Sequence, residues 1–301
     1  MPIEARAVSA PGGVAPDAAG PVTWRDLLAE ARRVLGSAGD ARRIVERASG
    51  FDGAQHHLRL DDPVTLRAAA HFEQMVRRRL AGEPLQYVLG AWGFRALDLY
   101  VDSRVLIPRP ETETVVEVAM AELRRLGRPT PLAVDLGTGS GNIALSLARE
   151  VPGVEVWGVD RSPEALAVAR ANLAGLGRAG AAVRLVEGGW FESLPPILRG
   201  RVDLVVSNPP YIAQHEVDDL PPEVSRWEPL AALVAGPTGL EHVATIVDQA
   251  PRWLSRPGVL VVEIAPHQRE DAAALARGAG FDPVDVRPDL SGRARVLVGR
   301  V

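Results

Sequence analysis

The chain has 301 residues, of which 47% are apolar and 24% are charged, as expected for a globular protein with one large domain or two smaller ones. Its net charge of −4 argues against binding of polyanions by the protein as a whole, and the absence of cysteine excludes disulfides, thiolate zinc sites and a cysteine nucleophile. No apolar run approaches the ~18 residues that a membrane-spanning helix requires.

The first 20 residues are rich in Ala, Gly and Pro, and they lack a basic stretch followed by an apolar core. We therefore expect a disordered lead-in over 1–20 and no signal peptide. Together with the absence of cysteine, this favours a cytoplasmic protein that is not attached to a membrane, and we expect no metal site.

Residues 21–90 are expected to form a small helical domain. The first helix begins with a plausible N-cap at Thr23, has Asp26 three residues later, and continues with apolar residues at helical spacing. Two further segments, 40–49 and 62–82, repeat this amphipathic pattern.

Residues 82–113 differ in character, with alternating apolar residues, several glycines and aromatics, and little helical periodicity. This pattern predicts a β-hairpin that links two parts of the chain, with the linker itself at 91–110. Helical spacing then resumes at 110–126.

The remaining part, 111–301, alternates between strand-like and helix-like segments. Strands are expected at 132–137, 154–160, 181–188, 201–210, 258–264, 281–287 and 293–300. Apolar strands separated by amphipathic helices predict an α/β fold, with a seven-stranded, mostly parallel Rossmann-like sheet covered on both faces. Because no clear helix separates the last two strands, one of them is expected to be antiparallel.

A glycine-rich loop, "DLGTGSGN", lies between the first of these strands and the next helix. Gly137, Gly139 and Gly141 allow backbone N–H groups to approach a ligand closely. A dinucleotide fingerprint would require glycine at position 142, where this chain has Asn, so the loop suits a smaller nucleoside. Asp160, at the end of the next strand, suits the two ribose hydroxyls. Taken alone, the loop also fits a simple strand-to-helix turn.

The segment "VVSNPPYIA" ends the fourth strand on Asn208, Pro209, Pro210 and Tyr211. The Asn208 side-chain oxygen and the Pro209 carbonyl offer two acceptors, which can hold both hydrogens of a planar NH₂ group and aim its nitrogen at an electrophile. Tyr211 could stack on a planar substrate, and the prolines stiffen the turn. A turn that merely ends the strand is the alternative for the motif in isolation.

Residues 130–301, with the glycine loop, Asp160 and "NPPY" at the ends of the first, second and fourth of these strands, resemble the class I S-adenosylmethionine-dependent methyltransferases. "NPPY" is similar to the signature of two groups of these enzymes. One group methylates the amino group of adenine in nucleic acids, and the other methylates a glutamine amide in proteins. The motif does not separate the two groups, because both substrates present a planar NH₂.

Other segments resemble the peptide chain release factor glutamine methyltransferases over ~23–301. They are "GEPLQYVLG", "FRALDLYVDSRVLIPRPETE", "RWEPLAALVAGPTGLEH" and "GVLVVEIAPHQ". The resemblance implies a helical N-terminal domain that docks the substrate, a hairpin linker, S-adenosyl-L-methionine as donor, and bacterial release factors as protein partners. The methylated residue would be the glutamine of their Gly-Gly-Gln motif.

The resemblance also assigns site residues. Cofactor contacts are implied for Gly137, Thr138, Gly139, Ser140, Gly141, Asp160, Trp190 and Asn208. The substrate glutamine would be held by Asn208, Pro209, Pro210 and Tyr211, with Phe94 and Arg109 nearby. Core packing is the alternative role for Phe94 and Trp190. Arg109 and Glu113 would cover the active site or form a local ion pair that pins the hairpin.

One position departs from the family. Relatives often carry an acid before the aromatic of "VEGGWF", where this chain has Gly189. An acid there would accept a hydrogen bond from the adenine amino group, so Trp190 stacking or backbone groups are left to hold the ring.

Two other functions stay open. An adenine methyltransferase acting on DNA or RNA needs a basic face, and residues 21–90 have only a small basic excess, with 11 Arg against 9 acidic residues. Direct nucleic-acid binding is therefore not expected. A protein that binds the cofactor or release factor without turnover is the third reading, and the intact "NPPY" argues against it.

Overall fold

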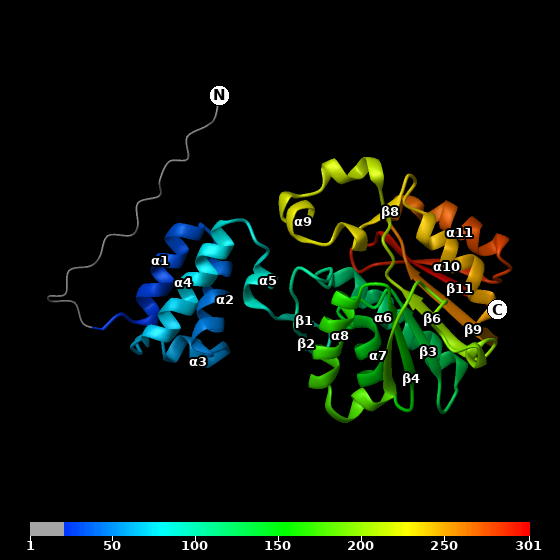
Figure 1. Ribbon diagram of the computed structural model, residues 1–301, viewed down its shortest axis with the longest axis horizontal. Coiled ribbons are helices and arrows are strands. Elements are labelled where there is room, and N and C mark those ends of the chain that lie inside the picture. The colour runs from blue at the N-terminus through cyan, green and yellow to red at the C-terminus, as the bar shows by residue number, and fades with distance from the viewer. Residues whose placement is uncertain (1–20) are drawn as a thin grey trace. The chain divides into compact units, whose positions relative to one another are not determined.

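The computed structural model describes residues 21–301, so the disordered lead-in expected over 1–20 lies outside the described residues. The chain divides into two compact units, the first ending at Leu80 and the second running from Ala81 to Val301 (Figure 1). No helix in the described part of the chain is long and apolar enough to cross a membrane.

The first unit is helical over its described residues. Its helices are α1 (Trp24–Leu35), α2 (Ala38–Ser49), α3 (Gly53–Leu58) and α4 (Leu66–Leu80). The expected capping box is present at the start of α1, where the Thr23 hydroxyl accepts from the Asp26 N–H and the Asp26 carboxylate accepts from the Thr23 N–H. Leu27 of α1, Ile44 of α2 and Phe72 of α4 are buried, so the amphipathic faces supply the core of this unit.

The second unit begins with the segment read from the sequence as a hairpin. It contains α5 (Leu85–Leu89), β1 (Trp92–Phe94), β2 (Leu97–Leu99) and α6 (Pro110–Leu126). The antiparallel pairing of β1 with β2 confirms the hairpin. The short helix α5 is missing from the sequence-based expectation, because five residues span little more than one turn and show no helical period.

The main sheet has seven strands, which confirms the expected Rossmann-like fold. They are β3 (Leu132–Leu136), β4 (Glu155–Asp160), β5 (Val183–Glu187), β6 (Val202–Ser207), β9 (Leu254–Glu263), β10 (Val284–Pro288) and β11 (Ala294–Arg300). Their order is β10-β11-β9-β6-β3-β4-β5. The central pairs are parallel, and β11 is antiparallel to both of its neighbours, as expected for one of the last two strands.

Helices cover both faces of this sheet (Figure 1). The remaining helices are α7 (Asn142–Glu150), α8 (Pro163–Gly175), α9 (Pro222–Trp227), α10 (Glu241–Gln249) and α11 (Arg269–Gly278). Alternate strand residues enter opposite cores: Ala133 packs with α6 and α7, whereas Val134 packs with α10 and α11. A small parallel pair, β7 (Ile212–Ala213) with β8 (Val234–Gly236), was not expected from the sequence.

The carboxyl ends of β3, β4, β6 and β9 therefore meet at one edge of the sheet, where open α/β sheets bind ligands. The glycine loop follows β3, Asp160 ends β4, the "NPPY" motif follows β6, and Glu263 ends β9. The parallel register thus brings together four segments that are separated along the chain.

Candidate active site

A cavity of about 380 Å³ opens at this edge of the sheet, a volume in the range of small-molecule sites. The expected site residues that line it are Arg109, Gly137, Thr138, Gly139, Ser140, Asp160, Trp190, Asn208 and Pro210. Four other expected residues, Phe94, Gly141, Pro209 and Tyr211, are not among its lining residues. The glycine loop, Asp160 and Asn208 thus share one pocket.

Asp160 is held at the pocket wall by the backbone of two loops. Its Oδ2 accepts from the Gly139 N–H at 2.8 Å, and its Oδ1 accepts from the Ser162 N–H at 2.9 Å. Partial burial raises its pKa. A carboxylate has about four acceptor positions, so two remain for the hydroxyls of a ligand. This donor and acceptor chemistry fits the ribose of a nucleoside.

Asp135, near the end of β3, supports the same loop from the protein interior. It is fully buried, and its Oδ2 accepts from the Thr138 hydroxyl at 2.6 Å and from the Ala144 N–H at 3.1 Å. Its Oδ1 has no hydrogen-bond partner within the described residues. Burial raises the pKa of Asp135 to about 7. The sequence showed Asp135 beside the loop but gave no sign of this supporting role.

Gly137, directly after β3, and Trp190 form another part of the pocket wall. Gly137 has φ +73°, and a Cβ there would lie 3.7 Å from the Trp190 ring. Trp190 itself has φ +44°, a strained value for a non-glycine residue. Its ring lies 5.1 Å from that of His242 and packs partly against the core. The indole therefore serves the core on one side and the pocket on the other.

A carboxylate lies at this wall although position 189 is glycine. Glu192 lines the pocket, and its Oε2 is 3.1 Å from the place that a Cβ on Gly189 would occupy. Glu192 is exposed and lies three residues further along the chain. No local pattern singles out Glu192, because the turn at 188–193 decides where its side chain lies.

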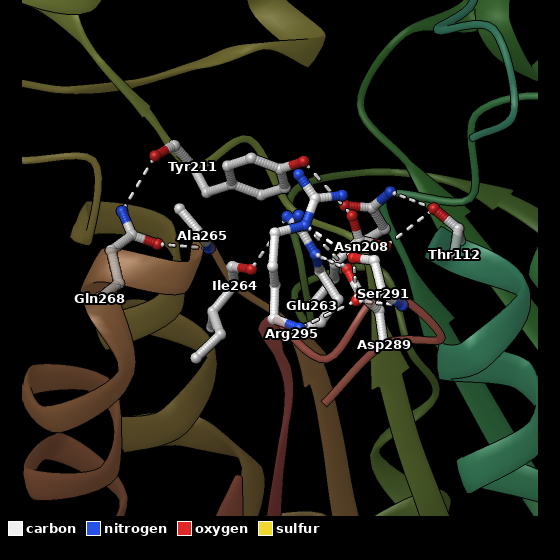
Figure 2. Close-up of polar contacts among 11 residues, drawn as sticks. Thr112, Asn208, Tyr211, Glu263, Ile264, Ala265, Gln268, Asp289, Ser291 and Arg295 are labelled. Atoms are coloured by element: carbon white, nitrogen blue, oxygen red, sulfur yellow. Dashed lines mark hydrogen bonds and ion pairs between the residues drawn. The ribbon is translucent and has the colours of Figure 1, made fainter. Parts of the chain in front are cut away.

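The "NPPY" loop is held by hydrogen bonds from two other elements (Figure 2). The Asn208 Nδ2 donates to Thr112 Oγ1 of α6 at 3.1 Å, and the Thr112 hydroxyl donates to Glu263 Oε2 of β9 at 2.7 Å. The Tyr211 hydroxyl donates to Glu263 Oε1 at 3.3 Å, and burial raises the pKa of Tyr211. Tyr211 therefore points at Glu263, whereas the sequence suggested that its ring stacks on the substrate.

Arg109 and Glu113 are not partners of each other. Arg109 Nη2 donates to Glu228 Oε1 at 2.5 Å, and Glu228 also accepts from the Ile107 N–H at 3.1 Å. Glu113 instead accepts from the Arg95 N–H in the turn between β1 and β2. Arg109 lines the pocket and Glu113 pins the hairpin, so the two roles weighed from the sequence fall to different residues. Local spacing could not reveal a partner 119 residues away.

Phe94 lies in the core and not at the pocket. Its side chain is 1% exposed and packs in the cluster that also contains Val115 of α6. Of the two roles considered for Phe94, the structure therefore supports core packing over a place at the substrate entry, because β1 turns this ring inward.

Comparisons with known proteins agree with this geometry. Residues 24–90 match the model of the PrmC N-terminal domain, and residues 120–221 match that of the methyltransferase small domain. A release factor glutamine methyltransferase of Cereibacter sphaeroides is 41% identical over 265 residues, covering 88% of this chain and 91% of its own length. The enzymes of the same name from Geobacter sulfurreducens and Deinococcus radiodurans are 41% and 39% identical, covering 86% and 92% of this chain and 87% and 98% of their own lengths.

The chain belongs to the release factor glutamine methyltransferase family. The family membership and the methyltransferase domain make it a protein-glutamine methyltransferase. Among solved structures, the hMettl16 catalytic domain in complex with a MAT2A 3'UTR hairpin has a TM-score of 0.54 at 16% identity, covering 77% of this chain and 80% of its own. At that identity the likeness shows a shared methyltransferase fold and no more.

Proposed function

We propose that the protein transfers a methyl group from S-adenosyl-L-methionine to the side-chain amide nitrogen of the glutamine in the Gly-Gly-Gln motif of peptide chain release factors. The observation that carries the proposal is the single pocket that joins the glycine loop and Asp160 to Asn208. The names of the relatives support the substrate class.

The donor would be held by three parts of the pocket wall. Asp160 accepts hydrogen bonds from the ribose, the loop from Gly137 to Ser140 brings its backbone close to the amino-acid end, and Trp190 packs on the ring. When bound, the donor supplies an electrophilic methyl carbon on a sulfonium, so the leaving thioether is neutral.

Asn208 and Pro209 would orient the glutamine. The Asn208 Oδ1 and the Pro209 carbonyl accept the two N–H groups of the substrate amide, which turns the nitrogen toward the methyl carbon. A strong base is not required, because the nitrogen loses its proton after transfer. Tyr211 and Pro210 keep the loop in shape.

In this proposal the reaction takes place in the cytoplasm, where release factors act. In this proposal the helical domain at 21–90 docks the release factor, the linker at 91–110 connects it to the catalytic domain at 111–301, and Arg109 borders the entry. Nucleic acid is not a substrate.

Mass spectrometry of release factor incubated with the protein and isotope-labelled S-adenosyl-L-methionine tests the proposal. We expect one labelled methyl group on the glutamine of Gly-Gly-Gln, and none on a release factor in which this glutamine is replaced. A parallel incubation with DNA and RNA oligonucleotides tests the alternative of adenine methylation. Label on adenine without label on release factor contradicts the proposal. Donor binding by calorimetry, without any transfer, would make the protein a binding module instead.

A further inference from the structure

Glu263 is the last residue of β9, and it lies behind the pocket rather than in its wall. Its side chain is 0% exposed, and its two oxygens accept hydrogen bonds from two hydroxyl groups, those of Thr112 and Tyr211 (Figure 2). One partner lies on α6 and the other in the "NPPY" loop. Glu263 therefore joins the helix and the loop that border Asn208.

The direction of the hydrogen bonds follows from the chemistry of the groups. An ionised carboxylate has no proton to give, so the Thr112 hydroxyl must donate to Glu263. The Thr112 oxygen is then left with lone pairs only, and it can accept but not donate toward Asn208. This matches the 3.1 Å hydrogen bond from Asn208 Nδ2 to Thr112 Oγ1. Because the NH₂ end of the amide is held there, its oxygen end is left for a ligand in the pocket that Asn208 lines.

The backbone of the same loop is fixed by a second residue that follows β9. The Gln268 Nε2 donates to the Tyr211 carbonyl at 2.9 Å, and its Oε1 accepts from the Ala265 N–H at 3.0 Å. Gln268 is 2% exposed. The segment from Glu263 to Gln268 thus holds both the side chain and the main chain of Tyr211.

The charged groups around Glu263 leave its carboxylate only partly compensated. Arg295 faces it, but the Arg295 side chain also pairs with Asp289, with 3.6 Å between Nε and Oδ2, and donates to the Ile264 carbonyl at 3.3 Å. Glu111 adds a like charge. Burial is the largest effect, and it raises the pKa of Glu263 to about 7. The donor and acceptor roles in the hydrogen bonds from Asn208 through Thr112 are therefore set by Glu263, which titrates near neutral pH.

We propose that Glu263 is a positioning residue for methyl transfer: acting through Thr112, and with Tyr211 held alongside, it determines that the oxygen of Asn208 faces the substrate amide. This inference rests on the proposed function, in which that oxygen accepts a hydrogen bond from the glutamine. Glu263 touches neither substrate nor donor in this scheme.

Glu263→Gln tests the proposal, because glutamine keeps the size of the side chain but presents an NH₂ donor as well as an acceptor. We expect kcat with release factor to fall at least 10-fold, while KM for S-adenosyl-L-methionine stays within about twofold. We also expect kcat of the parent protein to rise with pH through about 7, and this dependence to weaken in Glu263→Gln. The matched control is Glu122→Gln, the same change at a buried glutamate of α6 that is not among the residues lining the pocket.

A pair of changes at Thr112 separates positioning from packing. Thr112→Val keeps the shape and removes the hydroxyl, so we expect a loss of kcat similar to that of Glu263→Gln. Thr112→Ser keeps the hydroxyl and should retain kcat within about threefold. Equal kcat for the valine and serine variants, or a kcat of Glu263→Gln within twofold of the parent, overturns the proposal.

The side-chain amide of Asn208 can also be observed directly. The chain has only three asparagines, at 142, 172 and 208, so selective ¹⁵N labelling of asparagine gives three NH₂ groups, and Asn208→Ser identifies one of them. We expect the Asn208 NH₂ signals to shift in Thr112→Val and in Glu263→Gln, but not in Glu122→Gln. Unchanged signals overturn the proposal. If the parent protein transfers no methyl group to release factor, the proposed function fails, whereas these spectra still decide whether Glu263 orients Asn208.

Discussion

Two buried glutamates of the second unit have opposite surroundings. Glu122 of α6 is bound by the guanidinium groups of Arg125, Arg287 and Arg300. Burial alone would raise its pKa, but hydrogen bonds from Arg300 and Arg125 outweigh burial and lower the pKa to about 2. Glu263 of β9 has hydroxyl partners, and its pKa rises to about 7.

The difference separates a stabilising group from a group that serves the site. Three arginines compensate Glu122 fully, so it ties α6 to β10 and β11 and keeps its charge at any ordinary pH. Glu263, Asp135 and Asp160 lie at the carboxyl ends of the strands, and burial raises the pKa of all three. Incompletely compensated carboxylates thus gather at the edge of the sheet that carries the pocket, as perturbed pKa values do at functional sites.

The largest effect on activity is expected at Asn208, which lines the pocket at the edge of the sheet. Asn208→Ala removes the acceptor for the substrate amide, and we expect kcat to fall at least ~100-fold, because orientation of the nucleophile is lost. Donor affinity, measured by calorimetry, should fall only modestly. Turnover within a few-fold of the parent protein would show that the amide of Asn208 is not used.

The same comparison predicts the opposite outcome at Glu122. Glu122→Gln leaves three guanidinium groups without a carboxylate, and we expect the free energy of unfolding to fall by about 2–3 kcal/mol. The kcat of the folded protein should not change. Urea denaturation and a methyl-transfer assay below the melting temperature check both parts, and a loss of kcat at unchanged stability would break the distinction.

Asp160→Ala should act on binding. Removing the carboxylate takes two charged hydrogen-bond acceptors from the ribose and frees the Gly139 N–H, so we expect the donor Kd to rise about 10- to 50-fold, equivalent to about 2 kcal/mol. Calorimetry with S-adenosyl-L-methionine measures this change. An unchanged Kd would contradict the ribose assignment.

The smallest expected effect is on the pH dependence of stability. The folded pKa of Glu122 lies below its usual value of 4.5. Its contribution to the free energy of unfolding is therefore complete above pH 4.5 and is lost as the pH falls toward 2. The folded pKa of Glu263 lies above 4.5. Its contribution to the free energy of unfolding is therefore complete below pH 4.5 and is lost as the pH rises through about 7.

Between pH 6 and pH 8 the titration of Glu263 should lower the free energy of unfolding by about 1 kcal/mol. Asp135 titrates in the same range, so the measurement is the difference in unfolding free energy between Glu263→Gln and the parent protein at each pH. This difference should move by about 1 kcal/mol in favour of the variant at pH 8. A difference that does not depend on pH would show that Glu263 does not titrate there.

The central strands could be predicted from the sequence because parallel strands buried on both faces appear as nearly continuous apolar runs, as in 202–207, where only Asp203 and Ser207 are polar. The capping box at Thr23 was also visible, because it depends on residues three apart. The helix α5 was missed because five residues are too few to show a helical period, and the β7–β8 pair was missed because its two strands are very short and pair across a long loop. For Phe94 the sequence left two roles open, contact with the substrate and core packing, and the direction of β1 decides for the core.

The amino-acid sequence by itself determined the order of elements and the loops that carry the chemistry, because glycine spacing, strand ends and the "NPPY" motif are local properties of the chain. Only the tertiary structure decided which side chains support those loops. Asn208 meets Thr112 across 96 residues, Thr112 meets Glu263 across 151, and Arg109 meets Glu228 across 119. The register of the sheet and the packing of α6 produce these contacts, and no local pattern encodes hydrogen bonds between segments so far apart.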